Sequence, residues 1–120
     1  MNADELKNRT KRFSVNAAKT CMNFPKHLPF DVYVRQVIRS SSSVGANYRA
    51  ACRAKSPADF INKLKIVEEE ADETVFFLEL ILEFETRSET EIKNLIKEGY
   101  ELLAIVVASI NTAKKSYQRK

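Results

Sequence analysis

The stretch of this chain that decides the fold is residues 40–53, which read SSSSVGANYRAACR. Glycine and serine are poor helix formers, and one glycine costs about 1 kcal/mol relative to alanine in a helix interior. Residues with helical periodicity nevertheless flank the stretch, so tertiary packing must offset that cost. Because small side chains let a neighbouring helix approach closely, the stretch predicts the centre of a long helix, residues 30 to about 54, at a crowded helix crossing.

A phosphate-binding glycine loop is a poor fit to the same residues. The stretch holds one glycine, lacks the GxxxxGK[ST] pattern and follows no predicted strand. The apolar and small residues around it instead recur at about 100° per residue and mark one side of the helix. That side consists of Val34, Val37, Ile38, Ser41, Val44, Gly45, Tyr48 and Cys52.

A basic stripe follows a different side of the same helix. Its members fall within roughly 40° of one line by helical geometry. They are Arg35, Arg39, Arg49 and Arg53. The stripe either faces a polyanion or pairs with acidic side chains of a neighbouring helix, in the same subunit or the next.

A first helix is predicted before this one, from about residue 6 to the link at Pro25 and Pro29. Apolar or small residues recur there every three or four positions: Leu6, Thr10, Phe13, Ala17, Cys21 and Phe24. That spacing gives one face of an amphipathic helix. Proline cannot continue the hydrogen-bond ladder, so the link ends the helix.

A third helix is predicted from Pro57 to about Thr86. Ser56 suits the N-cap, Pro57 the first helical position, and Asp59 the positive end of the helix dipole. Its main apolar face holds Phe60, Leu64, Val67, Ala71, Thr74, Leu78 and Ile81. A second apolar face holds Ile66, Phe77, Leu80 and Phe84, with Glu73 in line. Each helix of a four-helix bundle touches two neighbours, which explains part of this face, and the remainder predicts a contact between subunits.

A fourth helix is predicted after the capping box formed by Ser88 and Glu91. Its apolar face holds Ile92, Leu95, Ile96, Gly99, Leu103, Val106, Ile110 and Ala113. Residues 102–108 are apolar all round, which again favours burial beyond the core of one chain. The predicted fold is therefore all-α: a single domain, residues 1–120, forming an antiparallel up-down-up-down four-helix bundle.

Charge is distributed unevenly over the 120 residues, whose formal net charge is +4. Residues 1–56 hold 11 Lys and Arg against 3 Asp and Glu, a net charge of +8. Residues 57–113 hold 5 against 13, a net charge of −8, and residues 114–120 add four positive charges. Such a chain can pair with itself, pair with its own copies, or present its basic half to a polyanion.

The sequence favours a cytoplasmic protein. The charged N-terminus lacks the apolar core of a secretory signal, and the longest apolar run, Leu102 to Ala108, is far shorter than the ~20 residues of a membrane span. Cys21 and Cys52 fall on apolar helical faces and are expected to be buried free thiols in a reducing compartment rather than a disulfide.

No catalytic, metal or cofactor site is predicted. Di-iron bundles use Glu-x-x-His motifs, whereas the acidic run 68–73 has none and the one histidine, His27, lies in a link. Neither the serines at 40–43 nor the cysteines have a histidine at helical spacing to act as a base. The acidic run is expected to pair with Lys63 and Lys65 and with the arginine stripe, and Glu73 to pair with an arginine of residues 30–54 or with Asn47.

Nucleic-acid binding is the first functional hypothesis. Cations of the first two predicted helices could form a surface that contacts phosphates. The candidate residues are Arg12, Arg35, Arg39, Arg49, Arg53 and Lys55. The second hypothesis is a protein-interaction scaffold or accessory subunit whose arginine stripe pairs with the acidic helix.

Four segments together resemble the bacterial 23S rRNA intervening-sequence protein family. They are residues 24–26 (FPK), 43–51 (SVGANYRAA), 56–64 (SPADFINKL) and 69–74 (EEADET). The resemblance extends in order over nearly the whole chain. It implies a cytoplasmic four-helix bundle that assembles as a homopentamer, with no agreed site residues. A related branch, the accessory variability protein of diversity-generating retroelements, implies binding of a reverse transcriptase and of nucleic acid.

Overall fold

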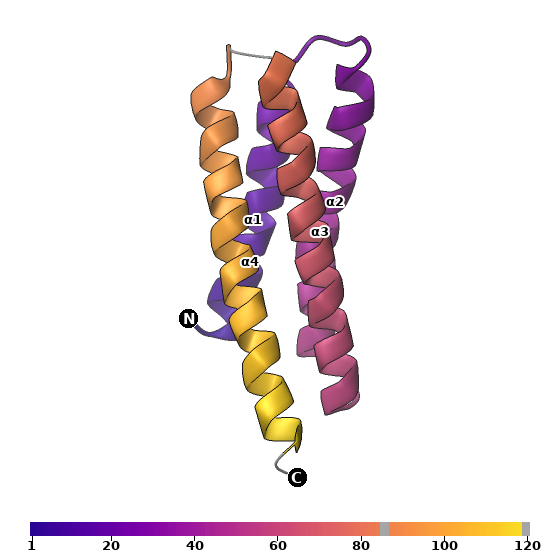
Figure 1. Ribbon diagram of the computed structural model, residues 1–120, viewed down its shortest axis with the longest axis vertical. Helices are drawn as coiled ribbons and strands as arrows, with labels where there is room; N and C mark the ends of the chain where they lie inside the picture. Colours follow the sequence, from indigo (N-terminus) through magenta and orange to yellow (C-terminus); the bar gives the residue numbers. More distant parts are fainter. Residues whose placement is uncertain (85–86, 119–120) are drawn as a thin grey trace.

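The chain folds into an antiparallel bundle of long helices (Figure 1). The computed structural model describes residues 1–84 and 87–118, and within these ranges lie four helices: α1 (Ala3–Cys21), α2 (Phe30–Cys52), α3 (Pro57–Phe84) and α4 (Glu89–Gln118). They run alternately up and down around one core, with extents of 52 × 21 × 20 Å. The predicted all-α four-helix bundle is confirmed. The helix end predicted near Thr86, and the terminal cations Arg119 and Lys120, fall outside the described residues.

Polar side chains cap the starts of α1 and α3. The backbone N–H of Glu5 donates to Asn2 Oδ1 at 2.8 Å, and Asn2 Nδ2 donates back to the Glu5 carboxylate at 3.1 Å. At α3 the N–H of Asp59 donates to Ser56 Oγ at 3.1 Å, as the sequence predicts. Asp59 Oδ2 in turn accepts from the N–H of Lys55 at 3.1 Å. These bonds satisfy backbone donors that the first helical turn leaves without partners.

The six residues predicted to form the apolar face of α1 are all buried. α1 is, however, the shortest of the four helices, with 19 residues against 30 in α4. Figure 1 shows that α1 begins well above the lower end of the bundle, where α2 meets α3 and α4 ends. α1 therefore does not extend to the lower ends of α3 and α4 (Figure 1).

The small-residue stretch lies where α2 crosses both neighbours, as predicted. On one side Ser14 Oγ of α1 donates to the backbone oxygen of Ser41 at 2.7 Å. On the other, Thr74 Oγ1 of α3 donates to Ser40 Oγ at 2.6 Å, and Ser40 Oγ donates to the Gln36 carbonyl at 2.7 Å. Ser40 and Thr74 are both fully buried. Because buried polar groups cost free energy unless paired, this bond favours a single register between α2 and α3.

One expectation about an apolar surface was wrong. Ile38 is 41% exposed, because α3 covers the Ser40 side of α2 and leaves the Ile38 edge in solvent. The second apolar face of α3 is covered in part by α2 of the same chain, as expected. The ring of Phe77 lies 6.1 Å from that of Tyr33, and the ring of Phe84 lies 6.4 Å from that of Phe30.

Both cysteines are free, as expected, with Cys21 buried and Cys52 half-buried. Burial raises the pKa of the Cys21 thiol from 9.0 to about 11. Burial, together with a hydrogen bond to Cys52, raises the pKa of Tyr48 from 10.0 to about 12. Both shifts arise because the core disfavours the charged form.

The glycine that limits helix approach is Gly99 of α4 rather than Gly45 of α2. A Cβ atom at Gly99 would lie 2.5 Å from Val75 Cγ2, whereas one at Gly45 would lie 3.5 Å from Thr10 Oγ1, an ordinary contact. We expect Gly99→Ala to destabilise the protein by about 1–3 kcal/mol through overpacking. Gly45→Ala should be neutral or stabilise by up to about 1 kcal/mol through helix propensity. Chemical denaturation measures both, and equal effects of the two substitutions would contradict this assignment.

The buried thiol predicts how stability depends on pH. Between pH 9 and about pH 11 the unfolded chain loses the Cys21 proton and the folded chain keeps it. The free energy of unfolding should therefore fall as the pH rises through this window, by roughly 1.4 kcal/mol per unit at most. Denaturation at pH 8 and pH 11 should show a smaller fall for Cys21→Ala than for the native chain. An identical fall in both proteins would disprove the role of Cys21.

Candidate nucleic-acid interface

The arginines of α2 meet different partners along the hairpin that α2 forms with α3. Ser56 lies at the turn of this hairpin, and residues at equal distances from it face one another across the two antiparallel helices. Arg39 and Glu73 each lie 17 residues from Ser56, and Arg49 and Lys63 each lie seven. The register thus places an acid opposite Arg39 and a cation opposite Arg49.

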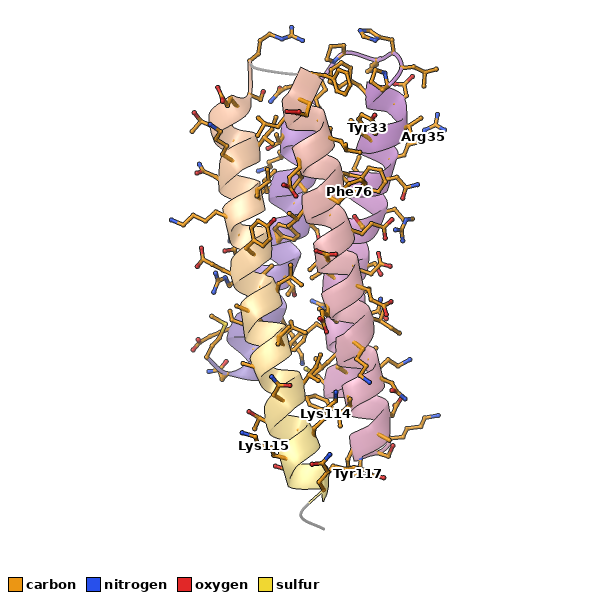
Figure 2. The ribbon with its side chains drawn as sticks, in the orientation of Figure 1. Tyr33, Arg35, Phe76, Lys114, Lys115 and Tyr117 are labelled. Atoms are coloured by element: carbon orange, nitrogen blue, oxygen red, sulfur yellow. The ribbon has the colours of Figure 1, made fainter. Side chains whose placement is uncertain are left out.

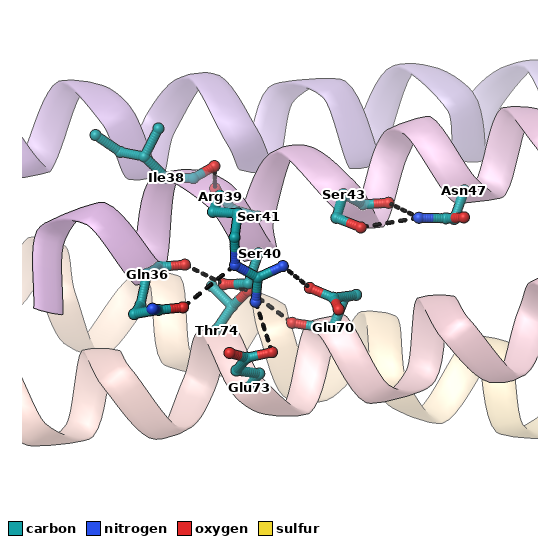
Figure 3. A network of polar contacts seen from close by, with 10 residues as sticks. All are labelled: Gln36, Ile38, Arg39, Ser40, Ser41, Ser43, Asn47, Glu70, Glu73 and Thr74. Atoms are coloured by element: carbon teal, nitrogen blue, oxygen red, sulfur yellow. Dashed lines mark hydrogen bonds and ion pairs between the residues drawn. The ribbon is translucent and has the colours of Figure 1, made fainter. Parts of the chain in front are cut away.

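Arg39 is held by the acidic face of α3 (Figure 3). Its Nη2 lies 2.7 Å from Glu73 Oε2, its Nη1 lies 3.1 Å from Glu70 Oε2, and its Nε donates to Gln36 Oε1 at 3.2 Å. The hydrogen bond to Glu73 is the main reason why the pKa of Arg39 is raised. The prediction that Glu73 pairs with an arginine of α2 is confirmed. Asn47, the alternative partner, instead donates to the carbonyl of Ser43.

Nearer the turn, Arg49, Arg53 and Lys55 line an open groove with Lys63 of α3. We call it the basic groove. Its volume is about 670 Å³, and its other lining residues are Ala46, Ala50 and Asp59. Asp59 is already bonded to the backbone N–H of Lys55. In the described part of the chain none of the four cations forms an ion pair, so the groove, with four cations and one carboxylate, keeps an excess of positive charge.

Lys63 lines the basic groove, although its sequence position had suggested an ion pair with the acidic run. It was expected to pair with the acidic run, but within residues 1–84 and 87–118 neither it nor Lys65 forms an ion pair. The sequence holds a signal for this position of Lys63. Ser56 marks the start of α3, and Arg49 and Lys63 lie at equal distances before and after it, so the two residues face each other across the hairpin.

Arg35 lies apart from the basic groove, near the opposite end of α2. Figure 2 shows its side chain pointing away from the bundle. The residue at the same distance from Ser56 on α3 is Phe77, which packs on Tyr33 and supplies no charge. Fourteen residues of helix, or about 21 Å, separate Arg35 from Arg49. The Arg39 ion pairs lie between them.

Arg12 belongs to a different surface, a groove of about 410 Å³ between α1 and α4. One end of this groove is closed by Arg9, whose Nε and Nη2 each lie 2.7 Å from an oxygen of Glu98. Arg9 also contacts Glu101 at 3.1 Å, and the hydrogen bond to Glu98 raises the pKa of Arg9. The six candidate cations are therefore divided among four places: the basic groove, the Arg39 cluster, Arg35 and the α1–α4 groove.

The described residues hold neither a cluster of metal ligands nor a membrane-spanning helix. No three or more His, Cys, Asp and Glu side chains within residues 1–84 and 87–118 are grouped so as to hold a metal ion. None of the helices in these ranges combines the length and the apolar character that crossing a membrane requires.

A family model described as 23S rRNA-intervening sequence protein matches residues 4–108. The chain belongs to this family. A crystal structure at 1.70 Å of a protein of unknown function from the S23 ribosomal protein family of Bacteroides thetaiotaomicron VPI-5482 is 34% identical. The alignment covers 88% of this chain and 97% of that one, with a TM-score of 0.75. Comparison with curated proteins gave no match.

Membership of the 23S rRNA-intervening sequence protein family confirms the resemblance seen in the sequence. The matched region contains all of α2 and α3, and hence the whole basic groove. It also contains the ion pairs of Arg39 with Glu70 and Glu73. The solved structure shows that a relative at this level of identity has the same fold.

Proposed function

We propose that this protein is a non-enzymatic, oligomeric bundle of the cytoplasm that binds RNA through the basic groove. The observation that carries the proposal is the concentration of Arg49, Arg53, Lys55 and Lys63 around one concavity. Each phosphate that such cations neutralise releases condensed counterions and adds affinity. Arg35 and Arg12 lie on separate surfaces and would extend the contact only to a long nucleic acid.

The lining of the basic groove favours recognition of the phosphate backbone. No aromatic ring and no side-chain amide lines it, only four cations, one carboxylate and two alanines. Base stacking needs aromatic platforms, and base readout needs donors and acceptors aimed at base edges. Binding through this groove should therefore depend weakly on sequence and strongly on salt.

The second hypothesis, in which the arginine stripe merely pairs with the acidic helix, is supported at Arg39 alone. An accessory subunit, for example of a reverse transcriptase, would still need a docking surface for its protein partner. Recovery of a protein partner from nuclease-treated lysate, by a variant that no longer binds RNA, would favour that hypothesis.

Removing two groove cations should weaken RNA binding in a salt-dependent way. For Arg49→Ala with Arg53→Ala, we expect the slope of log K against log salt to fall in magnitude by about 1–2, at roughly 0.7 per lost phosphate contact on single strands. Fluorescence anisotropy with a labelled RNA at 50–200 mM salt measures this slope.

Arg39→Ala is the control for this experiment, since it removes one arginine of the same helix at a site where Glu70 and Glu73 already neutralise it. Its affinity should stay close to that of the native chain. The proposal fails if the native chain binds no RNA at low salt, or if the double variant binds as well as the control.

The proposal of an oligomer is supported by apolar side chains that no helix of the same chain covers. On the outward face of α4, Tyr100 is 51% exposed and Val107 37%, and Ala104 between them is exposed too. Phe76 of α3 is 54% exposed. Large apolar surfaces of this kind mark interaction sites. We propose a homopentamer, the state that the resemblance to the family implies.

Light scattering coupled to size exclusion tests the assembly. The expected mass is five times the 13.7 kDa of one chain. Val107→Lys should shift the mass toward the monomer while the helical circular dichroism stays unchanged, because a lysine buried at an interface is costly. Val15→Lys, on the α1 surface and 42% exposed in the native chain, is the control. A 13.7 kDa native species at micromolar concentration would exclude the oligomer.

A further inference from the structure

The groove between α1 and α4 has the character of a ligand site and is separate from the basic groove. Among the neighbouring helix pairs, α1 and α4 have the least extensive contact, and polar residues line both sides of their seam. The resulting volume of about 410 Å³ lies within the range of small-molecule sites, roughly 300–1,000 Å³.

The two walls of this groove differ in chemistry. The α1 wall presents Arg12, Asn16 and Lys19, which follow one another at steps of four and three residues and so share a face. The α4 wall presents Glu91 and Asn94. Within residues 1–84 and 87–118, no ion pair engages Arg12, Lys19 or Glu91, so the opposed charges are not joined to each other.

The base of the groove is apolar and its lower end is fixed. Phe13, 1% exposed, and Leu95, 5% exposed, form the floor. The bidentate pair of Arg9 with Glu98 closes the lower end and neutralises both groups. A bound molecule would therefore meet a flat apolar surface below, cations on one side, and a carboxylate with an amide on the other.

We propose that the α1–α4 groove binds a mononucleotide. Its phosphate would lie on the α1 wall, where the planar guanidinium of Arg12 suits bidentate contact and Lys19 adds a second, flexible charge. Glu91 would accept hydrogen bonds from the ribose hydroxyls, the role that acidic residues play in other nucleotide sites. The carboxamides of Asn16 and Asn94 carry the paired donor and acceptor that match a base edge.

Isothermal titration with AMP, GMP, CMP and UMP tests the site on the full chain. At least one of them should bind, and Arg12→Gln should weaken binding by about tenfold or more, since it removes a charge-assisted contact. Asn94→Ala should change the preference among the four bases more than it changes the affinity for ribose phosphate. Adenosine lacks the phosphate, and inorganic phosphate lacks the base and the ribose. Each should therefore bind far more weakly than the nucleotide.

Two control variants separate this site from other cationic surfaces. Lys11→Gln removes an exposed charge next to Arg12 on α1, and Arg49→Gln removes one from the basic groove; both should leave nucleotide affinity unchanged. The proposal is overturned if none of the four nucleotides binds at millimolar concentration. It is equally overturned if inorganic phosphate binds as tightly as the nucleotide, or if Lys11→Gln and Arg12→Gln have the same effect.

Discussion

The register between α2 and α3 is the constraint on which the rest of this structure depends. The buried hydrogen bond from Thr74 to Ser40 links the two helices at their closest polar contact, and both side chains are fully excluded from water. Each hydroxyl also bonds a backbone carbonyl of its own helix at 2.7 Å, Ser40 that of Gln36 and Thr74 that of Glu70. A shift by one residue would therefore break the polar link between the two helices and move these buried hydroxyls against apolar neighbours. The small side chains on α2 make this contact possible because they permit close approach.

Once that register is set, the charges of the hairpin fall into two regions. Arg39 meets the acids of α3, and the ion pairs lie beside the Ser40–Thr74 bond (Figure 3). The basic groove lies nearer the turn than the acidic run does, and cations of both helices line it. The excess of positive charge in the first half of the sequence is thus cancelled in the middle of the hairpin and retained at its end.

Much of the fold could be predicted because helical periodicity and capping residues are local signals. The residues predicted for the face of α1 are all buried, although the helix ends at Cys21, before Phe24, and Thr20 is buried as well. The Ser56 cap fixed the start of α3. The errors arose where the burial of a side chain depends on which neighbouring helix covers that edge of its own helix. Ile38 and Ser40 lie on opposite edges of the same apolar stripe, and only the position of α3 decides that Ser40 is the buried one. For the candidate site, the arginines were found from the sequence, whereas their separation into paired and unpaired groups required the register. Lys63 was assigned to the acidic run for the same reason.

The short first helix also affects how the lower end of the bundle behaves. α1 does not reach the lower ends of α3 and α4 (Figure 1). Segments with less apolar burial open locally at lower free energy than the core does. Amide hydrogens around the α2–α3 turn should consequently exchange sooner than those near Ser40 and Thr74. The basic groove lies around this turn. In the proposed RNA complex, the spacing of its cations would therefore adjust to phosphates in different arrangements without disturbing the core.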